Sequence, residues 1–203
     1  SAHPEQTAFA PGDVVINEVA WMGTAASYNH EWIELYNTTN QDIDLTGWTL
    51  IAEDGTPNIT LNGIIPAYGY FLLERTSDNT ISDIPADQIY TGPLGNDPGA
   101  EILVLRDTSN QIIDTANGDG GPWPAGNNTT KQTMERIDPL APDTDDNWED
   151  NDGVIRNGLD ANGAPLNGTP RCRNSAASPL ADLTVGLTGP ATLDPGAEFS
   201  YVL

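Results

Sequence analysis

The chain of 203 residues is long enough for one large β domain, or for one domain of average size followed by a fragment of another. Its 20 glycines and 16 prolines, scattered between short runs of β-branched, leucine and aromatic residues, indicate strands joined by many turns rather than helices. With 30 acidic and 7 basic residues the net charge is -23, which excludes nucleic-acid or anionic-membrane binding through a basic surface.

The first predicted strand follows a leader. Residues 1–12 show no periodicity and include Pro4 and Pro11, so we expect a flexible segment and ordered structure from about Asp13 onwards. The run VVINEVAW at 14–21 is rich in β-branched and aromatic residues, which favours a strand.

A second strand is predicted at residues 30–36, after a polar loop. Its sequence, HEWIELY, alternates in the way that separates the two faces of a strand. Ile33 and Leu35 lie on one predicted face, and Trp32, Glu34 and Tyr36 lie on the other.

The third predicted strand, at 45–51, bends at Gly47 and directs Leu45, Trp48 and Leu50 into a core. Further strands are predicted at 59–61, 70–74, 88–90, 101–106, 111–115 and 132–136. A spacing of roughly 8–12 residues, with turn signals between, is typical of a β-sandwich or barrel.

After Arg136 the chain changes character. Residues 138–168 are dominated by Asp, Asn, Gly and Pro with isolated apolar anchors, which predicts a long irregular wrap. Residues 174–180 have the composition of a linker. Residues 181–203 contain two strand-like stretches, LTVGL and EFSYVL, which cannot form a core alone.

Five motifs occur in a characteristic order: INEVAW at 16–21, EWIELYN at 31–37, IDLTGWTL at 43–50, IPAYGYFLL at 65–73 and MERIDP at 134–139. Together they resemble a bacterial lamin tail domain over residues 14–172. The resemblance implies an all-β, immunoglobulin-like β-sandwich with long irregular acidic loops, a fold that occurs in nuclear lamins and in secreted bacterial proteins.

The predicted domain organisation follows from this resemblance. Residues 1–12 form the leader, 13–173 the lamin-tail-like sandwich, and 174–180 the linker. Residues 181–203 are similar to the opening strands of a bacterial surface immunoglobulin-like repeat; the alternative is a terminal hairpin that completes the sandwich.

Catalytic machinery is not evident in the sequence. The two histidines, His3 and His30, lack the spacing of a zinc site, and no nucleophile elbow is present. The single cysteine, Cys172, excludes an intrachain disulfide and has no convincing base near it in the sequence.

Three glutamates offer the carboxylates that a glycosidase pair would need: Glu18, Glu31 and Glu34. They lie inside the strand motifs, where a carboxylate usually faces water or accepts hydrogen bonds from a neighbouring loop. We expect the structural role for all three, and no required cofactor.

Two candidate binding sites remain. The aspartates Asp143, Asp145, Asp146, Asp150 and Asp152 lie in one acidic stretch whose oxygens suit calcium, although its spacing is not that of an EF-hand; the alternative is a solvated loop. Trp21 and Trp123 lie near loops, where exposed rings would bind a sugar or protein; the alternative is local loop packing.

The sequence therefore predicts a non-catalytic binding or tethering module of a secreted or surface-anchored bacterial protein, with a protein or polysaccharide ligand. One alternative is an accessory domain of a metal-dependent extracellular hydrolase, and another is a structural spacer in a surface stalk. No apolar run reaches the ~20 residues of a membrane span, and the pattern specifies no oligomeric state.

Overall fold

The computed structural model describes residues 9–96 and 100–177, and its regular structure is almost entirely β-strand. One 3-10 helix, η1 (Asp145–Asn147), precedes the last strand. The strands are β1 (Val14–Val19), β2 (Trp32–Asn37), β3 (Ile43–Asp44), β4 (Thr49–Ala52), β5 (Asn58–Thr60), β6 (Ile64–Ile65), β7 (Tyr70–Arg75), β8 (Gln88–Tyr90), β9 (Leu103–Arg106), β10 (Ile112–Ala116), β11 (Met134–Arg136) and β12 (Trp148–Asp150).

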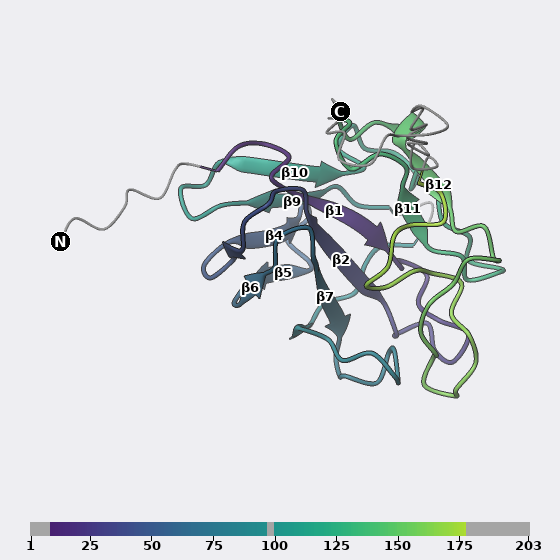
Figure 1. Ribbon diagram of the computed structural model, residues 1–203. Helices are drawn as coiled ribbons and strands as arrows, with labels where there is room; N and C mark the ends of the chain where they lie inside the picture. Colours follow the sequence, from purple (N-terminus) through teal and green to yellow (C-terminus); the bar gives the residue numbers. More distant parts are fainter. Residues whose placement is uncertain (1–8, 97–99, 178–203) are drawn as a thin grey trace, which may run out of the picture.

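The strands form two larger sheets and a small third one (Figure 1). The six-stranded sheet has the order β12-β11-β1-β2-β7-β8, and the four-stranded sheet has the order β10-β9-β4-β5. The β7–β8 pair is parallel, and the other pairs of both sheets are antiparallel. This arrangement confirms the predicted all-β sandwich.

The core lies between the two larger sheets. Ile33 and Leu35 of β2 belong to the same cluster of buried apolar side chains as Leu50 of β4 and Leu105 of β9. Trp48 is buried in this cluster, as its sequence position predicts. Burial of one such side chain contributes about 1.5–3 kcal/mol to the free energy of unfolding.

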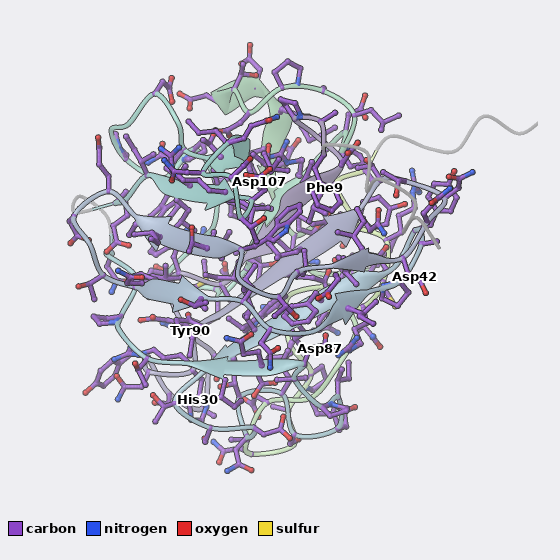
Figure 2. All side chains as sticks on the ribbon, turned by 90° about the vertical axis from the view of Figure 1, so that its left-hand side faces the viewer. Phe9, His30, Asp42, Asp87, Tyr90 and Asp107 are labelled. Carbon is purple, nitrogen blue, oxygen red and sulfur yellow. The ribbon has the colours of Figure 1, made fainter. Side chains whose placement is uncertain are left out.

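Packing begins before the predicted first strand. The ring of Phe9, which is labelled in Figure 2, lies edge-on against Trp48, with ring centroids 4.8 Å apart. The amide of Gly12 donates a hydrogen bond to the carbonyl oxygen of Ile113 at 2.8 Å. The ordered structure therefore begins before Asp13, where the sequence predicted its start. The prediction was too late because a single aromatic residue in an aperiodic segment gives no periodic signal.

Three short strands lie where only turns or irregular chain were predicted. Strands β3 and β6 pair with each other, and β12 pairs with β11 at the edge of the six-stranded sheet. Strand β12 forms inside the acidic stretch because Trp148, at its start, packs over the guanidinium group of Arg136, 4.8 Å from the ring centroid.

A buried ion pair links the two larger sheets. Arg136 of β11 lies 2.7 Å from the carboxylate of Asp114 in β10, and its Nε donates to the carbonyl oxygen of Ile16 in β1 at 2.9 Å. Both side chains are almost completely buried. The pair therefore joins strands of both sheets through charge-assisted hydrogen bonds.

The end of the described chain departs from the linker prediction. Asn174 is buried, and its amide donates hydrogen bonds to the carbonyl oxygens of Asn17 and Arg136, both at 2.9 Å. The packed domain therefore extends past Arg173. The predicted terminal segment 181–203 lies outside the described residues. Within the part that the structure describes, no helix has the length and apolarity of a membrane span.

Candidate binding surface

One face of the six-stranded sheet points away from the four-stranded sheet, and its centre carries three carboxyl side chains. Cross-strand pairing places Glu135 of β11 opposite Glu18 of β1, and Glu18 opposite Glu34 of β2. Because directly opposed residues project to the same side, the three form a row across the sheet, which we call the glutamate row. All three side chains are fully buried.

The glutamate row is covered by residues 151–177, which we call the strap. In Figure 1 the strap lies beside β1, β2, β11 and β12, away from the four-stranded sheet. Three of its backbone amides each donate a hydrogen bond to a different glutamate: Thr169 to Glu18, Arg171 to Glu34 and Ala176 to Glu135. Since buried backbone amides need acceptors, the row fixes the path of the strap.

Burial changes the acidity of these carboxyl groups. It raises the pKa of Glu18 well above its usual value, and the nearby Glu135 and Glu34 carboxyls raise that pKa further. Burial also raises the pKa of Glu34 to about 8, against the lowering effect of the hydrogen bond from Arg171. Glu18 and Glu34 are therefore buried carboxyl groups that keep their protons to higher pH than ordinary glutamates.

The structure places Glu18, Glu31 and Glu34, for which a structural role was expected, in contact with loop amides. Glu18 and Glu34 hold the strap, whereas Glu31 accepts the amide of Leu94 at 2.7 Å and pairs with Arg75 at 2.9 Å. Burial raises the pKa of Glu31 to about 7. Their oxygens are engaged by the protein itself, in agreement with the structural role expected from the sequence.

A groove of about 360 Å³ lies beside the glutamate row on the same face. Tyr36 of β2 and Tyr70 of β7 are directly opposed across the two strands, with ring centroids 5.1 Å apart and planes tilted by 41°. Residues 137–140 and the strap residues Arg173, Asn174 and Ala177 line it as well. We call this feature the tyrosine groove.

The tyrosine groove combines apolar surface with hydrogen-bonding groups. Both tyrosines are partly buried, and burial raises the pKa of each phenol, so both carry their protons at neutral pH. Leu140, at the rim, is 79% exposed. A rigid aromatic surface beside an exposed aliphatic side chain is the composition of a protein-binding site.

A β-bulge connects the glutamate row to the tyrosine groove. The register of β1 against β2 shifts between Ile16 and Glu18, which leaves Asn17 unpaired in the ladder. The freed Asn17 side chain donates a hydrogen bond to Asn174 of the strap at 2.9 Å, and Asn174 returns one to the Asn17 carbonyl oxygen. The bulge therefore holds the strap where it forms a wall of the groove.

The five aspartates predicted as calcium ligands do not converge. Asp143 accepts hydrogen bonds from Thr115, Gly118 and Trp148. Asp150 accepts one from the amide of Gly126, and Asp152 accepts those from the amides of Val154 and Ile155. Asp145 and Asp146 lie in η1. Across residues 9–96 and 100–177, no three histidine, cysteine or acidic side chains are grouped to hold a metal ion. The predicted shared site is not formed; Asp143, Asp150 and Asp152 each accept hydrogen bonds from separate donors.

The two tryptophans predicted near loops are both buried, which matches the loop-packing alternative. Trp21 and Trp123 stack with their planes 7° apart and centroids at 6.4 Å. Each indole nitrogen donates to a loop carbonyl oxygen, Trp21 to Ala125 and Trp123 to Gly95. The rings fasten loops together and offer no exposed platform, which corrects their assignment as ligand-binding residues.

The tyrosine groove itself was not predicted from the sequence. The alternation of 30–36 already placed Tyr36 opposite the core-facing Ile33 and Leu35, which is a usable signal. Tyr70 and Leu140 join Tyr36 only through the pairing of β2 with β7 and the path of the chain after β11. Such long-range pairings are not encoded in local periodicity.

A glycine in the strap provides a test of its close packing. A Cβ atom at Gly168 would lie 2.8 Å from Glu18 Oε1 and 2.9 Å from the ring of Trp32. We expect Gly168→Ala to lower the free energy of unfolding by about 1–3 kcal/mol, measured by urea denaturation. Ala161→Gly, at an exposed strap position, is the control and should cost less than about 1 kcal/mol. Equal effects at both positions would contradict the close packing.

Comparison with known proteins adds one finding. A family model described as the lamin tail domain matches residues 7–118, which is more than half of the chain and covers β1 to β10. No curated protein matches the chain. The matched range contains two of the three members of the glutamate row and both tyrosines of the groove.

Proposed function

The chain belongs to the lamin tail domain family, and we propose that it is a non-catalytic module that binds a protein ligand through the tyrosine groove and thereby tethers the polypeptide that carries it. Domains of this family are immunoglobulin-like β-sandwiches, generally without catalytic activity, and they mediate protein interactions. The proposal that this particular surface binds the ligand rests on the tyrosine groove.

The shape of the groove favours a protein ligand over a polysaccharide. Sugar rings stack on a flat, open aromatic face, whereas the Tyr36 and Tyr70 rings are tilted by 41° against each other and partly buried. Pro139 and Leu140 add apolar surface next to them. An amphipathic aromatic pair beside aliphatic side chains suits an apolar side chain of a protein segment, with hydrogen bonds from the phenols.

We further propose that the module works outside the cell, in a secreted or surface-anchored bacterial protein. The net charge of -23 supports this proposal, since it favours solubility and repels nucleic acid and anionic membranes. The order of the five sequence motifs, which resembles the bacterial members of the family, supports it too.

The exposed rim of the groove gives a direct test. Leu140→Asp changes a side chain that is 79% exposed, so folding should be retained, and it places a charge at the mouth of the groove. We expect a groove ligand selected from a displayed library of protein fragments to bind this variant at least about tenfold more weakly. Affinity is measured by titration calorimetry against the wild-type protein.

Val154→Asp is the matched control, because Val154 is 80% exposed and does not line the groove. Selected ligands that bind Leu140→Asp and wild type equally would contradict the proposed surface. Binding to a glycan array that is weakened by Leu140→Asp and not by Val154→Asp would show that the ligand of the groove is a polysaccharide rather than a protein. Hydrolysis of nucleic acid, phosphoester or glycan that one point mutation abolishes would overturn the non-catalytic function.

A further inference from the structure

Two carboxyl oxygens of the glutamate row face the same hydroxyl group. Thr169 Oγ1 lies 3.1 Å from Glu18 Oε2 and 2.8 Å from Glu135 Oε1. A threonine hydroxyl has one hydrogen and cannot donate to both oxygens. If both carboxyl groups were ionised, one of these buried contacts would hold two acceptors with no hydrogen between them.

The other donors around the row show which carboxyl supplies the second hydrogen. Both oxygens of Glu135 face fixed N–H donors: Asn151 Nδ2 at 2.7 Å on Oε1, and the amide of Ala176 at 2.9 Å on Oε2. Oε2 also lies 2.6 Å from the Ser175 hydroxyl, which accepts hydrogen bonds from the Asp152 amide and Asn151 Nδ2 and therefore donates its own hydrogen to Glu135. Glu18 Oε1 likewise accepts the amide of Thr169. Oε1 also contacts the Thr133 hydroxyl. Within residues 9–96 and 100–177, the hydrogen-bond partner of Glu18 Oε2 is the hydroxyl oxygen of Thr169, so a hydrogen fits on Oε2 and not on Glu135.

The electrostatic surroundings favour the same assignment. Glu34 of β2 and Glu135 of β11 flank Glu18, and Tyr70 of β7 and Cys172 of the strap are the other titratable groups nearby. Arg171 of the strap, whose guanidinium pairs at 2.7 Å with Asp87, is a cation that acts on Glu34. Burial, followed by the repulsion from Glu135 and Glu34, raises the pKa of Glu18 well above its usual value.

We propose that a proton held on Glu18 Oε2 and donated to Thr169 keeps the strap closed over the sheet, and that the strap opens when this proton is lost at alkaline pH. The proposal concerns the strap and does not depend on the ligand of the tyrosine groove. Because Arg173, Asn174 and Ala177 of the strap line that groove, opening would remove one of its walls.

Glutamine substitutions distinguish Glu18 from Glu135. In Glu18→Gln the side-chain oxygen keeps the role of Oε1 as acceptor, and the amide NH₂ takes the place of the protonated Oε2 and donates to Thr169. In Glu135→Gln the new NH₂ group meets Asn151 Nδ2 or the amide of Ala176, both of which are donors. The two substitutions are isosteric, so their opposite effects depend on the position of the proton.

The experiment measures amide hydrogen exchange of the strap in the whole chain at about pH 6 and about pH 9, corrected for intrinsic exchange. We expect protection at Thr169, Arg171 and Ala176 to fall at least about tenfold at the higher pH in the wild type. In Glu18→Gln the fall at Thr169, whose amide binds residue 18, should be at least severalfold smaller than in the wild type. The fall that remains at Arg171 reflects Glu34, whose pKa burial raises to about 8. In Glu135→Gln the protection should already be reduced at the lower pH.

Infrared spectroscopy provides a second measurement that does not depend on stability. The carbonyl stretch of a protonated carboxyl group should be present in the wild type near neutral pH, disappear as the strap opens, and lose intensity in Glu18→Gln. Strap protection that is equal at both pH values in the wild type would overturn the proposal. So would a Glu18→Gln variant whose strap is as poorly protected as that of Glu135→Gln.

Discussion

Replacing Arg136 by methionine is expected to lower the free energy of unfolding by about 3–5 kcal/mol, measured by urea denaturation at neutral pH. Methionine keeps much of the aliphatic volume but leaves the buried Asp114 carboxylate without its cation. It also removes donors from the carbonyl oxygens of Ile16 and Thr115 and ends the contact of the guanidinium with Trp148. These losses occur together because one side chain joins both sheets.

The dependence of this effect on pH is a further part of the expectation. Burial raises the pKa of Asp114 to about 6, although Arg136 lowers it, so removal of the arginine should raise that pKa further. Arg136→Met should then cost more at alkaline than at acidic pH. Arg106→Met, which removes a cation that donates to the carbonyl oxygen of Asn110, is the control. A cost of less than about 1 kcal/mol for Arg136→Met would contradict a structural role for the ion pair.

The protein as a whole is expected to lose about 3 kcal/mol or more of unfolding free energy as the pH rises from about 5 to about 8. Burial raises the pKa of Glu34 to about 8 and those of Glu31 and Glu74 to about 7. The folded state therefore binds more protons than the unfolded chain above the ordinary pKa of these groups. Their stabilising contribution is complete at low pH and is lost as the pH rises through 7 to 8.

High salt separates this effect from the repulsion between surface charges. The net charge of -23 also disfavours the compact state as carboxylates ionise, but salt screens exposed charges much more than buried ones. We expect the downward slope between about pH 5 and about pH 8 to persist in 1 M salt, a concentration at which the Debye length is about 3 Å. An unfolding free energy that is constant or rises over this interval would contradict the buried, protonated state of these glutamates.

The local part of the fold was predictable from the sequence, and the site depended on long-range contacts. Alternation in 30–36 correctly separated Ile33 and Leu35 from Glu34 and Tyr36, and the position of Trp48 in the core followed from its strand. Burial of Glu34 did not follow, because the strap residue that binds it is distant in sequence: the hydrogen bond from Arg171 spans 137 residues. Composition predicted a long irregular wrap over 138–168 and a linker from 174, and it did not show that the strap covers the sheet, since the packing of the strap rests on polar contacts rather than on apolar periodicity.

The separation in sequence between the glutamate row and the strap has a consequence for the order of events during synthesis. The hydrogen bond from Thr169 to Glu18 spans 151 residues, and that from Asn174 to Asn17 spans 157. On a chain that emerges from the ribosome N-terminus first, Glu18 and Glu34 stay hydrated and ionised until nearly all of the domain has been made. Their dehydration, and the uptake of the proton that it requires, therefore belongs to the final step of assembly.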